Sequence, residues 1–592
     1  MKRELLMGNE AIALAAFEAG VEVVAAYPGT PSTEIPETAA RFAKQYGVYV
    51  EFSTNEKVAL EVGIGASWAG KRALVTMKHV GLNVASDSLM TLSYTGVEGG
   101  FVLVSADEPD CHSSQNEQDN RIFARFANVP CLDPASPQEA RDMTIFAYDL
   151  SELFSIPVIL RPTTRVCHGR GDVELGEINI QKREGKFTKD VTKYVTVPSH
   201  SRALHKKLLY KMEKIREFIE DSNLNYVISG EGKTGIIVIG ASFNYVMESL
   251  KILGIKPPIL KIGISNPLAK NKVLSFIKDL EKVVIVEELE PVIENDIKIL
   301  VADNQLSLKV YGKSIFPRTG EFSTDLVTDI LSRFFRIELN KDQPKNISVP
   351  VRMPILCAGC PHRSTFYAIK KVTRGKAIFP SDIGCYTLGY TRPLQTVDTC
   401  ISMGSSFGIA CGLAKSVNEP IVATLGDSTF FHAGIPPLIN AKYNHSKIVA
   451  VILDNLTTAM TGHQPHPGTQ LTAMGDQAGS VSIEKLVAAM DIPVEVVDAN
   501  NVKSIEEAVK RGIESKEVYA IISRGPCVLL KGREKKPVFR VEVSMCRACK
   551  ACIKLSGCPA LEFKDGHSSI NPSVCTGCGL CAYICPVEAI KR

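Results

Sequence analysis

The first 170 residues alternate apolar runs with helical patterns. Residues 21–27 (VEVVAAY), 99–107 (GGFVLVSAD) and 155–162 (SIPVILRP) are continuous apolar runs with the length of a buried strand. Amphipathic stretches such as residues 55–70 lie between them. Because strands and helices alternate along the chain, we predict one doubly wound α/β domain over residues 1–170.

The pattern changes after this region. Residues 171–230 are rich in Lys and Glu and hold one helix with a single apolar face, which we interpret as a linker. Residues 231–345 return to strand–helix alternation and predict a smaller α/β domain. The polar, Pro-containing residues 340–354 predict a second linker, and residues 350–530 predict a third α/β domain.

The composition is that of an ordinary globular protein. Of 592 residues, 45% are hydrophobic, and 68 basic against 64 acidic residues give a net charge of +4. This balance gives no support for binding to nucleic acid or to a membrane surface. No apolar run approaches a membrane span, and Gly8, Asn9 and Glu10 interrupt any signal-peptide core. We therefore expect a cytoplasmic protein, in which the 17 cysteines bind metal rather than form disulfides.

A strand–helix–strand unit in the third α/β region carries candidate metal ligands. Residues 421–425 (IVATL) and 447–455 (KIVAVILDN) predict two strands that a helix at residues 433–444 joins. The ligand site of such a unit lies beyond the carboxyl ends of its strands, where Asp427 and Asn455 would meet. A carboxylate and an amide oxygen suit Mg²⁺ that holds a phosphate-bearing cofactor. The alternative is an ordinary turn with polar residues at its rim.

The same stretch resembles the thiamine diphosphate signature, in which Gly-Asp-Gly is followed by a helix and then by Asn-Asn. Gly426 and both expected metal ligands, Asp427 and Asn455, are kept. Ser428 replaces the second Gly, and Asp454 replaces the first Asn.

Eight cysteines form two sets within residues 538–592. The first set reads C-x2-C-x2-C-x5-C-P, and the second reads C-x2-C-x2-C-x3-C-P, the bacterial ferredoxin pattern. In that pattern the fourth cysteine of each set binds the cluster of the other set. The sequence thus predicts one [4Fe–4S] cluster on Cys546, Cys549, Cys552 and Cys585 and another on Cys575, Cys578, Cys581 and Cys558. Tetrahedral zinc is the alternative, but zinc sites rarely repeat this spacing with Cys-Pro endings.

Further motifs extend the similarity along the chain. They are YPGTPST at residues 27–33, SSQNEQD at 113–119, CAGCPHR at 357–363 and DIGCYTLG at 382–389. With them, the chain resembles the thiamine-dependent 2-oxoacid:ferredoxin oxidoreductases, most specifically the alpha subunits of the indolepyruvate-oxidising branch. The resemblance implies, in order, a pyrimidine-binding domain, a small domain like the transketolase C-terminal domain, a diphosphate-binding domain and a two-cluster ferredoxin domain.

The resemblance also implies an activity. It is the oxidative decarboxylation of arylpyruvates, with coenzyme A as co-substrate and ferredoxin as electron acceptor. The family's remaining domain, called gamma, is absent from this chain, which implies a smaller beta subunit that carries it. The alternatives are a different 2-oxoacid range, branched-chain or pyruvate, and a non-catalytic iron–sulfur electron-transfer subunit.

Two residues of the first domain are implied to act in the reaction. Glu56 corresponds to the family's glutamate that hydrogen-bonds the aminopyrimidine of the cofactor and assists its deprotonation. Thr30 corresponds to a hydroxyl near the substrate. Each also has an ordinary explanation: a negative charge at a helix N-terminus for Glu56, and turn chemistry for Thr30.

In the third domain, the resemblance implies Mg²⁺ ligation by Asp427, Asn455 and the backbone carbonyl of Thr457, beside Gly426 and Ser428. It further implies a third cluster near thiamine, against which stands the alternative of buried thiols. The ligands of this third cluster would be Cys357, Cys360, Cys385 and Cys527.

One departure concerns the substrate carboxylate. Pyruvate-using relatives carry an Arg just after the strand FVLVSA, where this chain has Asp107 and Glu108. This difference favours arylpyruvates over pyruvate, and Arg121, Arg161 and Arg165 are the candidates to bind the carboxylate instead. Three histidines in motif loops are candidate proton shuttles, with an ordinary structural role as the alternative: His79, His112 and His432.

Overall fold

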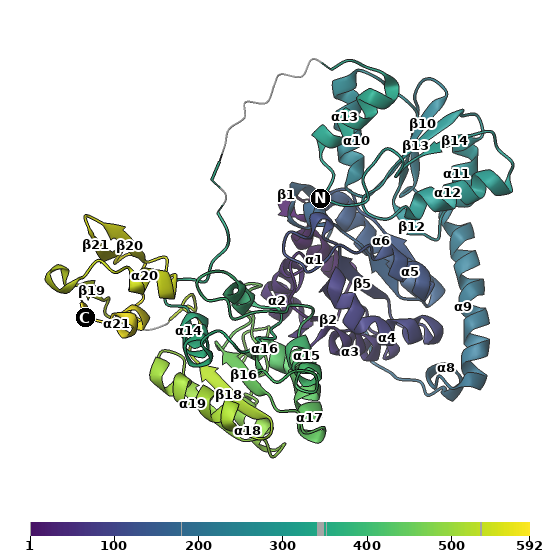
Figure 1. Cartoon of the computed structure of the whole chain (residues 1–592). Helices are drawn as coiled ribbons and strands as arrows, with labels where there is room; N and C mark the ends of the chain where they lie inside the picture. Colours follow the sequence, from purple (N-terminus) through teal and green to yellow (C-terminus); the bar gives the residue numbers. More distant parts are fainter. Residues whose placement is uncertain (1, 179, 340–348, 351, 533–535) are drawn as a thin grey trace. The chain divides into compact units, whose positions relative to one another are not determined.

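The computed structural model describes residues 2–178, 180–339, 349–350, 352–532 and 536–592. The chain divides into two compact units, Met1–Asn346 and Ile347–Arg592 (Figure 1). Most of the linker predicted at residues 340–354 lies outside the described residues. Within the described ranges, every helix is too short or too polar to cross a membrane.

A seven-stranded sheet organises the beginning of the first unit. All neighbours in it run parallel except the edge pair formed by β12 and β6. The runs predicted as strands at residues 21–27, 99–107 and 155–162 are confirmed. In sheet order the strands are β12 (Ile264–Asn266), β6 (Cys131–Leu132), β7 (Val158–Leu160), β5 (Phe101–Ala106), β4 (Ala73–Lys78), β2 (Val23–Ala26) and β3 (Tyr49–Phe52).

Helices from the same region pack around this sheet. Helix α1 packs against α2 and α6, and α3 packs against α4. A separate antiparallel pair, β1 (Lys2–Met7) and β8 (Arg170–Leu175), lies beside α1. The helices are α1 (Gly8–Glu18), α2 (Glu34–Tyr46), α3 (Glu56–Trp68), α4 (His79–Thr95), α5 (Arg121–Ala127), α6 (Pro137–Phe154) and α7 (Thr164–His168).

The long helix α9 (Pro198–Ile219) forms as predicted in the Lys- and Glu-rich segment, after the short α8 (Val191–Tyr194). It packs against α4 through one apolar face. The buried residues of that face are Leu204, Leu208, Met212, Ile215 and Ile219.

A second sheet, with five strands, follows in the first unit. Its order is β14 (Lys309–Tyr311), β13 (Lys282–Val286), β10 (Thr234–Ile239), β11 (Ile259–Ile262) and β9 (Tyr226–Ile228). Separate apolar clusters pack on it, so both faces are covered. Since β12 comes from this segment yet pairs with β6, the two α/β regions share a sheet edge. The helices are α10 (Ser242–Leu253), α11 (Lys270–Ile277), α12 (Val292–Asp303) and α13 (Thr324–Phe335).

The second unit is built on a four-stranded parallel sheet between two apolar clusters. Its strand order is β15 (Val422–Gly426), β16 (Val449–Asp454), β18 (Tyr519–Arg524) and β17 (Val494–Asp498). The two strands predicted around the candidate metal ligands are therefore confirmed and adjacent. The helices of this region are α14 (Pro361–Thr373), α15 (Ser405–Leu413), α16 (Asp427–Thr429), α17 (Ile435–Tyr443), α18 (Ile483–Ala488) and α19 (Val502–Glu514).

The helical run after β15 begins earlier than the sequence predicted. Helix α16 starts at Asp427, and a π-turn over Phe430–Gly434 connects it to α17. The sequence predicted a helix only from residue 433. Pro436 and Pro437 lack N–H groups, so they release the carbonyls of the preceding turn from the regular pattern, and the turn widens. Because α16 begins at Asp427, the carboxylate of this residue lies at a helix N-terminus.

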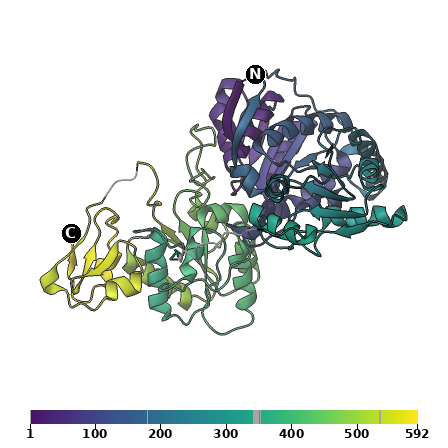
Figure 2. The same ribbon diagram turned by 90° about the horizontal axis from the view of Figure 1, so that it is seen from above.

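The cysteine-rich segment packs against this α/β region within the second unit, as Figure 2 shows for the yellow C-terminal ribbon beside the green one. Leu580 and Ile584 of α21 belong to the same apolar cluster as Phe366 and Ile369 of α14. The segment is therefore anchored through its own helix. Its elements are β19 (Arg540–Val541), α20 (Ala551–Ser556), β20 (Leu561–Lys564), β21 (His567–Ile570), α21 (Leu580–Ile584) and β22 (Ile590–Lys591).

Candidate active site

Glu56 is the first residue of α3 in the first unit. The N-cap of this helix is Asn55, whose side chain accepts a hydrogen bond from the N–H of Val58 at 2.9 Å. Glu56 is only 5% exposed. A Cβ atom on Gly81 of α4 would come within 2.7 Å of Glu56 Oε1. Glycine at this position therefore lets α4 approach closely enough to enclose the Glu56 carboxyl group.

The YPGTPST loop follows β2 and lies against Lys78 at the end of β4. Ser32 closes the loop, because its N–H and its Oγ both donate to the carbonyl of Gly29 at 2.8 Å. A Cβ on Gly29 would lie 3.0 Å from the Lys78 side chain. Burial lowers the pKa of Lys78, and the charges of Glu108 and Glu56 oppose that shift. Half-buried Thr30 and buried Glu56 therefore lie at one end of the sheet, together with Lys78.

His79, at the start of α4, is completely buried. Its Nε2 lies 3.1 Å from the carbonyl oxygen of Asn116 in the SSQNEQD loop. Burial lowers the pKa of His79, so the ring is neutral near pH 7. Among the described residues its Nδ1 atom has no hydrogen-bond partner, and a buried polar atom of this kind normally has one. His79 therefore offers a ring nitrogen that a ligand could satisfy.

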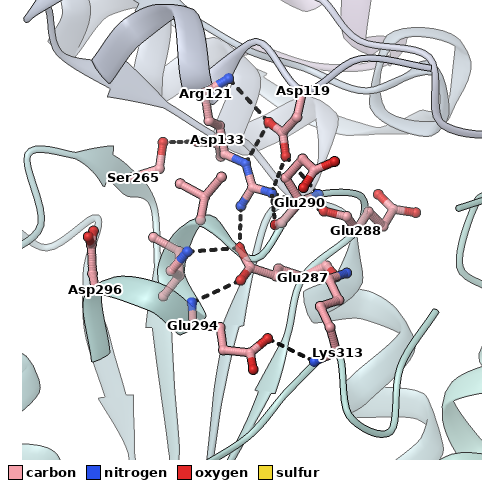
Figure 3. A network of polar contacts seen from close by, with 12 residues as sticks. Asp119, Arg121, Asp133, Ser265, Glu287, Glu288, Glu290, Glu294, Asp296 and Lys313 are labelled. Carbon is pink, nitrogen blue, oxygen red and sulfur yellow. Dashed lines mark hydrogen bonds and ion pairs between the residues drawn. The ribbon is translucent and has the colours of Figure 1, made fainter. Parts of the chain in front are cut away.

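Two of the three candidate carboxylate-binding arginines are already paired inside the protein. Arg121 donates to Asp119 at 2.9 Å and to Glu287 at 2.7 Å (Figure 3). Arg161 donates to Asp107 at 2.7 Å and to Asp133 at 3.1 Å. Both guanidinium groups are buried. Both neutralise buried carboxylates, so a substrate would have to replace these pairs. Arg161 Nη2 has no hydrogen-bond partner among the described residues, and it lies 3.7 Å from Asp119 Oδ1.

Arg165 and His112 lie at the surface. The Arg165 side chain is 64% exposed and pairs with Glu321 at 2.6 Å. His112 Nε2 lies 3.5 Å from the same carboxylate. Of the three candidate arginines, Arg165 is the one that solvent reaches.

We predict that the free energy of unfolding depends on pH through Glu288, which lies at the buried junction shown in Figure 3. This carboxyl accepts a hydrogen bond from the N–H of Phe322 at 2.8 Å, and burial raises its pKa to about 7 from 4.5. The folded state therefore favours the protonated form. This stabilisation is complete below pH 4.5 and is lost as pH rises through about 7. The loss between about pH 5 and pH 8 is about 2.5 kcal/mol, at 1.36 kcal/mol per pKa unit.

Glu288→Gln should remove that pH dependence, since glutamine keeps the hydrogen bond and cannot ionise. Urea unfolding of the wild-type and variant proteins at both pH values measures it. Glu231→Gln, a substitution of an exposed glutamate, is the matched control. Equal pH slopes in wild type and Glu288→Gln would contradict the prediction.

In the second unit, Asp427 and Asp454 leave neighbouring strands side by side. Gly426 is aligned with Leu453 in the parallel pair β15–β16, so the next residues, Asp427 and Asp454, lie opposite each other. Burial opposes ionisation of Asp427, but contact with His466, 3.2 Å away, lowers its pKa. Burial and the charge of Asp427 raise the pKa of Asp454. Asp427 is thus the more acidic member of the pair and suits a cation.

The other predicted ligands lie in the turn after β16. Asn455 is 7% exposed, and its Nδ2 lies 3.4 Å from His362 Nε2. The N–H of Thr457 donates to Asn455 Oδ1 at 3.3 Å. Thr458 Oγ1 donates to Ser428 Oγ at 3.0 Å, which holds the turn against the start of α16.

His362, beside Asn455, contributes an uncharged imidazole ring to this candidate metal site. Burial lowers its pKa to about 4, against the opposing charge of Asp427. The arrangement offers a carboxylate, an amide and backbone carbonyls, the oxygen ligands that Mg²⁺ uses in phosphate-binding sites. The residues present therefore fit a metal that holds a diphosphate.

The four cysteines of the hypothetical third cluster lie near one another in the second unit. Burial raises the pKa of Cys360 to about 12, and the nearby thiols Cys357 and Cys385 add to the rise. Burial likewise raises the pKa of Cys385 to about 11, with contributions from Cys527 and Cys357. Cys527 also donates its N–H to the carbonyl of Asn455 at 3.0 Å. The group is therefore adjacent to the predicted diphosphate site.

Each predicted quartet of the C-terminal segment surrounds one small cavity. The first cavity is lined by Cys558, Cys575, Cys578 and Cys581, and the second by Cys546, Cys549, Cys552 and Cys585. This is the exchanged pairing that the spacing predicted. Within the described part of the chain, no three His, Cys, Asp or Glu side chains are grouped to hold a single metal ion. Four thiols around a cavity are the donor set of a [4Fe–4S] cluster.

Comparisons with protein families match each part of the chain. Models described as "Pyruvate flavodoxin/ferredoxin oxidoreductase, thiamine diP-bdg" and "Indolepyruvate oxidoreductase domain" match residues 14–215 and 227–329. Models described as "Thiamine pyrophosphate enzyme, C-terminal TPP binding domain" and "4Fe-4S binding domain" match residues 382–523 and 569–591.

Curated relatives match over nearly their full length. "Indolepyruvate oxidoreductase subunit IorA" of Thermococcus kodakarensis is 46% identical, with 100% of this chain and 97% of the relative aligned. The proteins of the same name from Methanothermobacter thermautotrophicus and Archaeoglobus fulgidus are each 44% identical, with 99% and 100% of this chain and 97% of each relative aligned.

Fold, candidate sites and family models together define a thiamine diphosphate-dependent iron–sulfur oxidoreductase of the class that oxidises 2-oxoacids with ferredoxin as acceptor. Within this class, the chain belongs to the IorA family of indolepyruvate oxidoreductase subunits. The predicted family, the α/β fold class with a ferredoxin-like domain, and the use of thiamine diphosphate and iron–sulfur clusters are confirmed.

Several residues of these sites were not found by sequence reasoning. They adjoin predicted ones: Lys78 is the last residue of β4 and precedes His79, and His362 belongs to the CPHR motif. His466, in the segment HQPHPG, contacts Asp427 across 39 positions of the chain. Their motifs could have marked them as candidates, but only the tertiary contacts indicate what they do.

Proposed function

We propose that this chain is the catalytic alpha subunit of an arylpyruvate:ferredoxin oxidoreductase. With coenzyme A, it would convert indolepyruvate and similar 2-oxoacids to the aryl-acyl-CoA and CO₂, with reduction of ferredoxin. Its partner would be a smaller beta subunit that carries the gamma-type domain. The observation that carries this proposal is the alignment with subunits named for indolepyruvate over 97% of their length.

When bound, thiamine diphosphate supplies the chemistry that releases CO₂ from a 2-oxoacid, and the clusters carry electrons singly. We assign the pyrimidine end of the cofactor to residues 1–170 and the diphosphate end to residues 350–530. Glu56 would hold the aminopyrimidine through its enclosed carboxyl group, and Thr30 would lie on the substrate side. The second-unit ligands of Mg²⁺ would be Asp427, Asn455 and the Thr457 carbonyl, beside Gly426 and Ser428.

For the substrate carboxylate, Arg165 is the remaining candidate of the original three. Its exposure supports this assignment, and its ion pair with Glu321 lies at the surface of the described protein. The neutral ring of His79 could serve the reacting groups as a hydrogen-bonding partner through Nδ1.

The substrate range can be tested on the enzyme purified with its partner subunit. Ferredoxin reduction is measured without oxygen, with coenzyme A and with indolepyruvate, phenylpyruvate or 2-oxoisovalerate. We expect the highest kcat/KM for the two aryl substrates. Preference for 2-oxoisovalerate would favour the branched-chain alternative, and no turnover with any 2-oxoacid would favour an electron-transfer subunit.

We also propose a third [4Fe–4S] cluster on Cys357, Cys360, Cys385 and Cys527, because these thiols adjoin one another and the diphosphate site. The expected iron content of the complex is about 12 per alpha chain, from three four-iron clusters. Iron and acid-labile sulfide analysis measures it. Cys385→Ser should lower the content by about four irons. A content of about eight in the wild type would contradict the third cluster and leave the two C-terminal clusters standing.

A further inference from the structure

One face of α14 is turned toward the C-terminal cysteine-rich segment. Arg363, Tyr367 and Lys371 recur every fourth residue along this helix, so they share a face. Lys371 Nζ lies 2.9 Å from Glu506 Oε1 and donates to the Tyr583 hydroxyl at 3.1 Å. The rings of Tyr367 and Tyr583 meet edge to face. Helix α14 is therefore the element on which the cysteine-rich segment docks.

At the start of this face, the guanidinium of Arg363 joins two cysteine segments. Arg363 is 3% exposed, and its Nη1 donates to the carbonyl of Ser556 at 2.7 Å. Its Nη2 donates to the carbonyl of Leu356. Ser556 precedes Cys558 by two positions, and Leu356 directly precedes Cys357. One side chain thus holds the backbone beside a ligand of two of the three proposed clusters, Cys558 in one and Cys357 in the other.

One nitrogen of the Arg363 guanidinium group has no hydrogen-bond acceptor within the described protein. Its Nε is buried and has no hydrogen-bond partner among the described residues. Arg363 lines the cavity formed by Cys558, Cys575, Cys578 and Cys581. A buried N–H without a partner is costly, and the sulfur atoms of a bound cluster are acceptors. A cluster bound in this cavity would fill it and would accept a hydrogen bond from Arg363 Nε.

A second orphan polar atom lines the same cavity. Thr576 Oγ1, between Cys575 and Cys578, is buried and lacks a hydrogen-bond partner in the described part of the chain. A Cβ on Gly359 would come within 1.7 Å of it. Gly359 therefore permits the CAGC loop to touch the CTGC loop. The contact brings the two cysteine loops together beside Arg363.

The charge of Arg363 acts on both cysteine groups. Burial lowers the pKa of Arg363, and the nearby thiols of Cys558, Cys360, Cys578 and Cys357 oppose that shift. When a cluster accepts an electron, its negative charge increases. A fixed positive charge and N–H donors next to its sulfur atoms stabilise that reduced state and raise the reduction potential.

We propose that Arg363 donates a hydrogen bond from Nε to the sulfur of the cluster held by Cys558, Cys575, Cys578 and Cys581, and thereby sets the potential of that cluster. Arg363 is a positioning residue for electron transfer between the thiamine-binding region and the ferredoxin-like segment. The step moves one electron, released by 2-oxoacid oxidation, onto the oxidised cluster, and no proton moves. The inference rests on the proposed assignment of this cluster.

The test compares Arg363→Met with Arg363→Lys in the enzyme purified with its partner subunit. Redox titration monitored by electron paramagnetic resonance gives the midpoint potential of each cluster, and the relevant signal is the one lost in Cys578→Ser. Arg363→Met should weaken reduction of this cluster about tenfold, a fall of about 59 mV for one electron. Arg363→Lys keeps the charge and should give a smaller fall. Lys371→Met, on the same face but 46% exposed before substitution, is the control and should leave the potential unchanged.

Unchanged midpoints in both Arg363 variants at wild-type iron content would overturn the inference and leave the cluster assignment intact. Absence of the Cys578-dependent signal from the wild type would instead refute the assignment. If Arg363→Met loses the cluster, Arg363→Lys decides, because lysine retains the positive charge and lacks the Nε–H donor. A lower midpoint in Arg363→Lys supports the inference, and an unchanged midpoint overturns it.

Discussion

Replacement of Glu56 by glutamine is expected to lower ferredoxin reduction by about 10²–10⁴-fold, the usual contribution of a positioned acid–base group. Glutamine keeps the shape that fits against Gly81 but cannot exchange a proton. Thiamine content and thermal stability should stay close to wild type. The measurement is kcat with indolepyruvate in the enzyme purified with its partner, beside cofactor content and unfolding temperature.

The ordinary explanation for Glu56 makes a different prediction. A negative charge at the N-terminus of α3 would contribute about 0.3–1 kcal/mol to stability and nothing to turnover. Glu61→Gln makes the same chemical change in the same helix at an exposed position and serves as control. Comparable activity in Glu56→Gln and Glu61→Gln would refute the catalytic assignment.

Replacement of Asp427 by asparagine is expected to weaken binding of Mg²⁺ and thiamine diphosphate by more than about 100-fold. That figure is the upper end for loss of an outer-shell partner, and a direct ligand should cost more. Asp427 is the more acidic member of a buried carboxylate pair, so its loss removes a negative charge that the cation requires. Titration of the cofactor-free enzyme with thiamine diphosphate and Mg²⁺ measures the effect.

Asp454→Asn is the matched control for Asp427→Asn. It changes the neighbouring carboxylate in the same way and restores the Asn-Asn of the thiamine signature. The pKa of Asp454 is raised, and its charge is offset by a 2.6 Å ion pair with Arg524, so Asp454→Asn removes less net negative charge at the cation site. Cofactor affinity should therefore change much less. Equal losses in the two variants would show that Asp427 acts only through the buried pair.

Local patterns were sufficient for several features. The apolar run of residues 421–425 and the polar Gly426-Asp427 that ends it predicted both the strand and its candidate ligand, because strand length and polarity are properties of neighbouring residues. The partition of the eight cysteines also followed from spacing, since C-x2-C-x2-C places three thiols on one tight loop. The resemblance supplied Glu56, which the structure then places in an enclosed position.

Long-range contacts determine which of the candidate arginines are already paired inside the protein. In sequence, Arg121 and Arg161 have the same appearance as a substrate-binding arginine. The partner of Arg121, Glu287, lies 166 positions further along the chain. Whether a guanidinium is free depends on such distant carboxylates, and no local pattern encodes their approach. The position of strand β12 also depends on a long-range contact. Its pairing with β6 joins segments that the sequence assigned to separate domains.

The sequence by itself determined the family, the α/β regions and the use of thiamine diphosphate and iron–sulfur clusters, and it supplied most candidate residues of the sites, because these depend on periodicity, spacing and motif identity. The tertiary structure decided which candidate arginines are already paired, which of two adjacent carboxylates is the more acidic, and how the ferredoxin-like segment docks on α14. It also placed Arg363 beside the carbonyl of Ser556, 193 positions away. Burial and charge at these points arise only when distant segments pack together, and packing sets the desolvation and electrostatic energies that give each side chain its role.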